Sequence, residues 1–218
     1  MKRSLLVPSI LVLFSFALPL FGQPTESEAS TSVKVYGGWN TWVLGSAVLA
    51  AAADSGDTTS GSVSAGGFSF GADLLFGKAH GTQYGLGCAC LPMLQGSAEG
   101  SGVSLDMIPI VVEACLNGSG NFYADLGLGL GFLVASLNSD VISSGTTSVF
   151  SPSPGFLAKV GLGFRFPISR VVGIDVGADA YLPFSDFGII SGSAINSAAL
   201  DVIAFSQLNL RAGLSFDL

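Results

Sequence analysis

The sequence predicts an all-β protein, an eight-stranded antiparallel up-and-down transmembrane β-barrel. Three observations lead to this prediction: a high hydrophobic content without a spanning helix, eight segments of alternating apolar residues, and charges confined to one parity of those segments. The 218 residues are 49% hydrophobic and 11% charged, with a mean hydropathy of +0.64. Past residue 22, no stretch approaches the ~18 consecutive apolar residues of a spanning helix. A closed barrel is the other structure that satisfies its backbone polar groups in lipid.

The first 22 residues have the features of a secretory signal peptide. Lys2 and Arg3 precede an apolar run over residues 5–21, and cleavage is expected near Gly22. Leu20 departs from the small residue preferred at that position, and an uncleaved anchor is the alternative. No Cys follows directly, which argues against a lipoprotein. The expected mature chain, residues 23–218, is one barrel domain with six Lys and Arg against fifteen Asp and Glu, a formal charge of −9.

Residues 122–134 show the strand pattern most clearly. One parity carries apolar side chains throughout, whereas the other carries Tyr123, Asp125 and three glycines. A period of two indicates a β-strand with two unlike faces. A strand face exposed to water normally carries Lys, Glu and Thr, so we expect lipid on the apolar side and a narrow interior on the other.

Seven further segments alternate in the same way. In chain order, the eight expected strands cover residues 32–42, 64–76, 83–94, 104–116, 122–135, 155–166, 171–182 and 202–218. Most reach the ~9–11 residues of a tilted spanning strand. The connections between them have 21, 6, 9, 5, 19, 4 and 19 residues, so long and short ones alternate. This rhythm is typical of long extracellular loops and tight periplasmic turns.

Charged residues fall on the non-lipid face when the phase of each strand is set by its apolar residues. These residues are Lys34, Asp73, Glu113, Asp125, Lys159, Arg165, Asp175, Asp179, Arg211 and Asp217. A Lys or Arg facing lipid at the bilayer midplane would cost ~2–4 kcal/mol, which explains the segregation. The strand 104–116 fits least well, because residues 107–112 are apolar on both faces. Asp106 has the opposite parity to Glu113 and is expected at the rim.

An eight-stranded barrel encloses a lumen just wide enough for side chains to fill. Counting back from a turn at residues 167–170 places Lys159 nearly opposite Asp179. Opposite charges in a narrow, poorly hydrated space should pair. Two interpretations remain open for this charge network: a structural plug of salt bridges, or a gated pore whose acidic excess favours cations.

Three short segments carry a resemblance to a known family: Ile108–Val111, Ala124–Gly129 and the alternating C-terminus from Leu210. With the eight-strand plan, they resemble the small outer-membrane barrels that include the OmpA membrane domain, OmpX, OmpW and the opacity proteins. Leu214, Phe216 and Leu218 are similar to the family's C-terminal assembly signal, which usually ends in an aromatic residue. The resemblance implies the outer membrane of a diderm bacterium, extracellular loops, and lipid and the barrel-assembly machinery as partners. The barrel is expected to be a monomer.

The expected extracellular loops are acidic and partly apolar. They contain no Lys or Arg, and their carboxylates are Asp54, Asp57, Glu99, Asp140, Asp186 and Asp201. Solvation explains this charge, and the alternative is a basic partner or divalent cations. Apolar runs at residues 47–53 and 187–190 indicate either a binding surface or strands that extend past the membrane.

No catalytic, metal or cofactor site can be assembled from the sequence. The single His, His80, lies in a short turn, so no base is available to activate a serine. Cys88 and Cys90 share the lipid face and act as small apolar residues, and Cys115 lies too far away to bridge them. An odd count leaves an intermolecular disulfide open. An acidic chain does not favour nucleic acid as a partner.

The sequence therefore predicts a non-enzymatic outer-membrane barrel. Its expected role is structural or adhesin-like, through loops that contact a host or surface ligand. The alternative is a narrow channel for small solutes or, as in OmpW-type proteins, small hydrophobic molecules. Inward charges fit a hydrophobic passage poorly. A soluble secreted β-sandwich is the rival fold.

Overall fold

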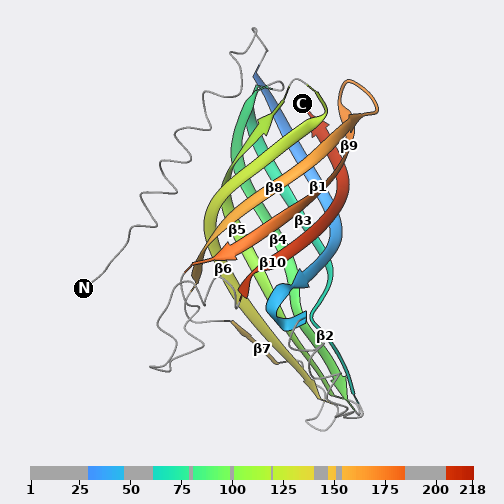
Figure 1. Cartoon of the computed structure of the whole chain (residues 1–218), viewed down its shortest axis with the longest axis vertical. Helices are drawn as coiled ribbons and strands as arrows, with labels where there is room; N and C mark the ends of the chain where they lie inside the picture. The colour runs from blue at the N-terminus through green and yellow to red at the C-terminus, as the bar shows by residue number, and fades with distance from the viewer. Residues whose placement is uncertain are drawn as a thin grey trace, which may run out of the picture.

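The computed structural model describes residues 29–46, 61–78, 81–98, 101–118, 120–139, 147–150, 154–184 and 205–218. Eight antiparallel strands form the barrel: β1 (Ala29–Trp42), β3 (Gly66–Lys78), β4 (Thr82–Ala98), β5 (Ser101–Asn117), β6 (Phe122–Ser139), β8 (Gly155–Pro167), β9 (Val172–Pro183) and β10 (Gln207–Asp217). Each pairs with the next along the chain, and β1 pairs with β10, which closes the barrel. The predicted all-β up-and-down barrel is confirmed (Figure 1).

Several sequence predictions lie outside the described residues. These are the signal peptide, His80, the six loop carboxylates and the apolar loop runs. Within the described ranges, residues 43–46 form one helical turn, and no helix there has the length and apolar character to cross a bilayer.

Three strands, β4, β5 and β6, continue further than their apolar patterns predict. The expected nine-residue loop at 95–103 is mostly strand, because β4 continues to Ala98 and β5 starts at Ser101, and these two residues pair. The alternation of apolar residues stops earlier than the backbone pairing does. The sequence pattern therefore predicted where the alternation of apolar residues ends, and it did not predict the part of each strand that continues past that point.

The longer strands continue past the barrel as part of the same sheet, and we name this part the extension. Two short strands flank it: β2 (Gly61–Ser64) pairs with β4, and β7 (Thr147–Phe150) pairs with β6. Its strand order is β2-β4-β5-β6-β7, and it projects at the end opposite the C-terminus (Figure 1). A β-bulge in β4 between Pro92 and Leu94 lies where the barrel wall becomes the extension.

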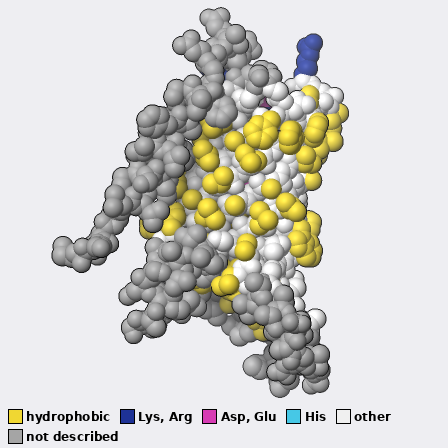
Figure 2. Space-filling view, viewed as in Figure 1, with side chains coloured by type: hydrophobic (Ala, Val, Ile, Leu, Met, Phe, Trp, Pro, Cys, Tyr) yellow, Lys and Arg dark blue, Asp and Glu magenta, His cyan; other side chains and the backbone are white. Residues whose placement is uncertain are grey.

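The outward face of the barrel is apolar, as predicted. Figure 2 shows hydrophobic side chains over the visible wall. Phe68 and Phe156 near the extension are 67% and 56% exposed, and Phe76 and Phe164 near the short turns are 51% and 50% exposed. Phe68 and Phe76 are eight residues apart on β3, and Phe156 and Phe164 are eight residues apart on β8. This separation is ~20 Å along the barrel axis for ~3.3 Å per residue and a ~40° tilt. The two aromatic levels thus lie at the edges of an apolar outer belt, whose height is close to that of the apolar band of a membrane barrel.

The inward side chains divide into a charged zone and an apolar zone. Charged residues lie toward the short turns, whereas Leu91, Met93, Met107, Leu133 and Leu157 are fully or almost fully buried toward the extension. The segment 107–112 is apolar on both faces because its inward residues belong to this second zone. Sequence analysis did not predict an apolar zone inside the barrel.

Candidate functional site

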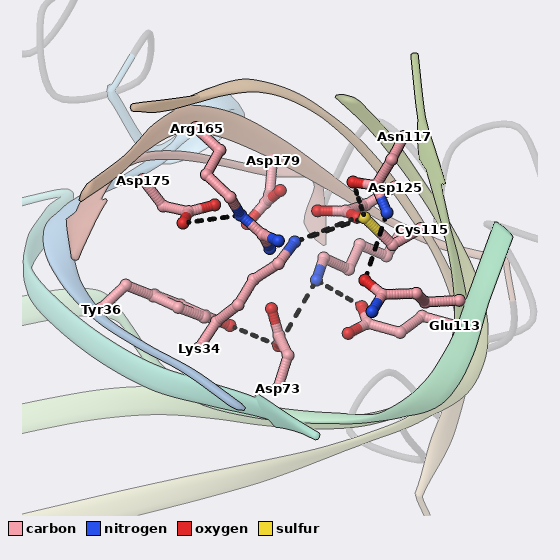
Figure 3. Close-up of polar contacts among 12 residues, drawn as sticks. Lys34, Tyr36, Asp73, Glu113, Cys115, Asn117, Asp125, Arg165, Asp175 and Asp179 are labelled. Carbon is pink, nitrogen blue, oxygen red and sulfur yellow. Dashed lines mark hydrogen bonds and ion pairs between the residues drawn. The ribbon is translucent and has the colours of Figure 1, made fainter. Parts of the chain in front are cut away.

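Seven charged side chains meet inside the barrel, and we name them the central cluster. Seven strands contribute one residue each: Lys34, Asp73, Glu113, Asp125, Lys159, Asp179 and Arg211. Each lies on the inward parity of its strand, opposite the apolar parity. All seven residues are buried, with at most 4% of their surface exposed. Figure 3 labels Lys34, Asp73, Glu113, Asp125 and Asp179 among them, and their side chains point into the barrel.

Lys159 joins the carboxylates of Glu113 and Asp73. Its Nζ donates to Glu113 Oε2 at 2.6 Å and lies 3.7 Å from Asp73 Oδ1. Asp179, which was expected nearly opposite Lys159, pairs in register with Gly161, and Lys159 pairs with Tyr181. Asp179 instead makes its ion pair with Arg211.

The turn between β8 and β9 explains the error in register. Ser169 Oγ accepts hydrogen bonds from the N–H groups of Val171 and Val172, at 3.2 and 3.0 Å. Pro167 pairs with Gly173, so five residues, 168–172, lie between these paired positions where a four-residue turn at 167–170 was expected. The longer connection changes every later pair along the two strands, and Lys159 therefore faces Tyr181.

Arg211 joins three carboxylates across the lumen. Its Nη2 donates to Asp125 Oδ2 at 2.7 Å, its Nε lies 2.7 Å from Asp179 Oδ2, and its Nη1 lies 3.8 Å from Asp73. The guanidinium also lies over the Tyr36 ring, 4.7 Å from its centroid. A planar group with several donors suits this position better than the single ammonium of Lys would.

Lys34 completes the cluster from β1. Its Nζ lies 3.6 Å from Asp125 Oδ1, 3.4 Å from Cys115 Sγ and 4.0 Å from the centroid of the Tyr123 ring. Three cations therefore face four carboxylates in a space with almost no solvent exposure. Buried charges of this kind are tolerated only when they are paired and hydrogen-bonded.

Inward glycines provide the room for these long side chains. A Cβ at Gly161 would overlap Asp179 Oδ1, and one at Gly87 would lie 2.7 Å from Asp73 Oδ1. At Gly71 it would lie 2.6 Å from the Tyr36 ring. These strands thus combine a greasy outer parity with a glycine-rich inner one because larger neighbours occupy the inner space.

A smaller ion-pair group lies at the short-turn end of the lumen. Arg165 Nε lies 3.3 Å from Asp175 Oδ2, and Arg165 Nη1 lies 3.5 Å from Asp217 Oδ1. The Arg165 and Asp217 side chains are 15% and 31% exposed, so this group sits closer to solvent than the central cluster. It connects β8, β9 and β10.

A band of uncharged polar residues lies inside the barrel, on the side of the central cluster that faces away from the short turns. Asn40 Nδ2 donates to the Pro92 carbonyl at 2.7 Å and also to Gln207, and Ser69 Oγ donates to Asn209 Oδ1 at 2.6 Å. These residues are uncharged and were therefore not among the residues expected in the lumen network. Their parity, shared with Lys34, Asp73 and Arg211 on the same strands, would have identified them.

The apolar zone lies beyond this band. Its buried residues include Ala89, Val111, Tyr181 and the five residues named above, and Phe205 packs with them from just before β10. Trp42 and Leu105 also pack against the zone. The N–H of Val43 donates to the Ser206 carbonyl at 3.1 Å, which holds the helical turn after β1 close to the start of β10.

The predicted assembly residues lie on the outer face at the closing seam. Leu214 and Phe216 pair in register with Val35 and Val33 of β1. The backbone of Leu218 exchanges hydrogen bonds with Thr31 at 2.8 and 3.3 Å. Leu214 is 41% exposed and Leu218 75% exposed. The C-terminal strand thus presents an apolar edge stripe at the point where the barrel closes.

The cysteines are free, and the part of the chain that the structure describes holds no arrangement of His, Cys, Asp and Glu suited to a metal. Cys88 is exposed on the outer wall, as predicted, whereas Cys115 is buried inside the lumen.

The fold matches solved outer-membrane barrels. One is Ail, the attachment invasion locus protein of Yersinia pestis, in complex with the heparin analogue sucrose octasulfate, with a TM-score of 0.50 and 11% identity over 89% of this chain and 100% of that one. Another is Neisserial surface protein A, with a TM-score of 0.50 and 14% identity over 87% of this chain and 97% of that one. No family model and no curated protein matches this chain. The chain therefore has the fold of the small eight-stranded outer-membrane barrels.

Proposed function

We propose that this chain is a non-enzymatic outer-membrane protein with a closed interior, which acts through contacts made at the end that carries the extension. The observation that supports this proposal most strongly is that buried side chains occupy the interior of the barrel. The central cluster and the apolar zone follow one another along the lumen, and both are buried. A protein that does not conduct through its lumen must act through its surface.

The outward face supports the location. Exposed Phe, Leu, Ile and Val side chains cover the wall between two aromatic levels, and the charged residues of the central cluster lie inside. In water such a wall would drive aggregation, whereas lipid is its natural solvent. We accordingly propose the outer membrane of a diderm bacterium, a monomeric state, and folding by the barrel-assembly machinery.

The two zones support closure. A hydrated ion would first have to cross Leu and Met side chains, which offer it no polar partners, and then separate ion pairs such as Lys159–Glu113 and Arg211–Asp125. Removing one partner from a buried pair leaves an uncompensated charge, which costs several kcal/mol. Both steps oppose passage.

A surface role is supported by the extension and by the structural neighbours. Ail is described as an attachment and invasion protein and was solved with a sulfated polyanion. The present chain differs in charge, since its long connections carry six carboxylates and neither Lys nor Arg. We therefore propose a basic partner rather than a sulfated one, because opposite potentials attract and like potentials repel.

Planar-bilayer recordings of the purified, refolded protein test the closed interior. No steady conductance is expected at moderate voltage. Discrete, long-lived openings would overturn closure and favour the alternative, a narrow channel for small solutes. Heat-dependent migration in detergent gels, expected for a folded barrel, confirms in parallel that the recorded sample is folded.

A further inference from the structure

The extension has two unlike faces, which cross-strand register assigns. One row on its outer face contains Ser64, Gln95, Ser104 and Ser136, and the next contains Ser62, Ser97 and Gly102. Residues directly opposite each other on paired strands point to the same face. Val63 and Val103 form the intervening row and point to the other face, which continues from the apolar zone of the lumen.

The hydroxyl-bearing face continues the lipid-facing wall. On β5 the outward residues run Val112, Ile110 and Ile108, then Asp106, Ser104 and Gly102. On β6 they run through Phe132 and Val134 to Ser136. Asp106 pairs with Val134 and Ser104 with Ser136, so β5 becomes polar one row before β6, and both strands are polar from the Ser104–Ser136 row outward. This change is expected where the wall leaves the hydrocarbon.

The height of the two rows identifies what surrounds them. They lie four and six residues beyond Ile108 and Phe132, or ~10 and ~15 Å along the axis for ~3.3 Å per residue and a ~40° tilt. A phospholipid headgroup layer is only ~5–8 Å thick, half the difference between the full bilayer and its hydrocarbon core. A simple phospholipid would therefore leave these rows uncovered, whereas a headgroup of several sugars would reach both.

The chemistry of the face selects among large headgroups. Its described groups are serine hydroxyls and the Asp106 carboxylate, which accepts from Ser104 Oγ at 3.4 Å. Lys and Arg are absent from the sequence between residues 79 and 158 and between 35 and 77. Phosphate clusters would meet no cation here. Sugar hydroxyls both donate and accept, which matches this set of groups.

We propose that the outer face of the extension is a contact surface for the uncharged, sugar-bearing headgroups of outer-leaflet lipids. This proposal rests on the membrane location proposed above and adds a lipid class to it. The face thereby fixes the height of the barrel in the membrane and leaves the opposite, valine-bearing face of the extension free for other contacts.

Cysteine accessibility in vesicles tests the contact. The background carries Cys88→Ala and Cys90→Ala and keeps the buried Cys115 as a blank. Ser97→Cys and Ser104→Cys report on the outer face, and Val103→Cys is the matched control from the opposite face of the same hairpin. Labelling by a water-soluble maleimide is compared in vesicles of dimyristoylphosphatidylcholine alone, with one fifth digalactosyldiacylglycerol, or with one fifth phosphatidylglycerol.

The galactolipid is expected to slow labelling several-fold at Ser97→Cys and Ser104→Cys and to leave Val103→Cys unchanged, while phosphatidylglycerol slows none of them. Equal labelling in the three vesicles, or equal protection by both added lipids, overturns the proposal. Ile110→Cys separates this failure from failure of the membrane location, since free labelling there in all vesicles would contradict the location itself.

A second measurement tests recognition rather than proximity. Native mass spectrometry of protein released from the galactolipid vesicles should show retained galactolipid, reduced several-fold by the combined Ser64→Ala, Ser97→Ala and Ser104→Ala substitutions. The combined Val63→Thr and Val103→Thr substitutions on the other face should leave retention unchanged. Equal retention in the two variants would mean that the outer face is not the binding surface.

Discussion

Arg211 is the residue with the most ion-pair partners among the described side chains. Its guanidinium contacts carboxylates from β3, β6 and β9, so one side chain links four strands when its own is counted. Single charges inside a narrow barrel are costly, and the arrangement works because each one has a partner on another strand. Inward glycines are the complement of these long side chains.

Replacing Arg211 by Met should destabilise the barrel by ~3–5 kcal/mol, because Asp125 and Asp179 would lose their closest cation. Arg165→Met at the rim, where the side chain is 15% exposed, is the control and should cost less. Urea unfolding of the vesicle-inserted protein, followed by gel mobility, measures both. Equal midpoints for Arg211→Met and the parent would show that the cluster does not contribute to stability.

Gly161→Ala should destabilise the barrel by ~1–3 kcal/mol, since the added methyl overlaps Asp179 Oδ1 and lies 3.2 Å from Asp125 Cβ. Gly96→Ala is a matched control in the extension, where the nearest atom to a new Cβ is 3.8 Å away. The same unfolding assay compares them. A larger loss for Gly96→Ala would contradict the crowding described around Gly161.

The extension is an element that the barrel does not need for closure. The barrel strands pair around the full ring below it, whereas β2 and β7 each pair with one strand of the extension alone. Its edges lack Lys and Pro, which commonly protect exposed strand edges. We therefore expect it to open independently of the barrel.

Val103→Pro should disrupt the extension and leave the barrel intact, because Val103 lies between β4 and β6 and proline cannot donate to a ladder. Amide exchange should accelerate at residues 95–104 and remain slow at residues 108–116. Val111→Pro, placed within the barrel wall, is the contrasting variant and should prevent folding. Uniform acceleration across β5 in Val103→Pro would mean that extension and barrel form one cooperative unit.

The whole molecule is closed by its last strand. β10 pairs with β1 over Gln207–Asp217, and the Leu218 backbone bonds to Thr31. Assembly therefore cannot finish until the C-terminal residues reach the N-terminal strand. This gives the outward stripe at Leu214, Phe216 and Leu218 a structural position that agrees with an assembly signal.

Phe216→Ala should lower the fraction of protein assembled by the barrel-assembly machinery in reconstituted vesicles, because it removes the aromatic residue closest to the C-terminus. Phe164→Ala is the control, since Phe164 lies on the same outer face near the same end but on β8. Folded and unfolded bands in semi-native gels give the fraction over time. If both variants assemble equally slowly, then lipid contact rather than a C-terminal signal explains the loss.

Much of this architecture follows from the chain alone. The period of two is a local property, so the alternation of apolar residues correctly assigned Lys34, Asp73, Glu113, Asp125 and Arg211 to the interior. The same pattern located every barrel strand, but it placed a nine-residue loop at 95–103 where β4 and β5 continue to Ala98 and from Ser101. Because a charged side chain facing lipid is costly, the charged and apolar residues of a spanning strand must lie on opposite parities, and this separation can be read from the sequence.

Other features depended on contacts between strands and were decided by the three-dimensional arrangement. Lys159 pairs with Glu113 because the Ser169 turn sets the register and the curvature of the barrel brings β5 opposite β8. Met107 and Val111 belong to an interior apolar zone that can be seen only once residues of several strands stand together. The strands of the extension continue past the last apolar outward residues, because backbone hydrogen bonds between strands do not require lipid around them. Local periodicity determines which way a side chain points, and only the closed sheet determines which partner it meets.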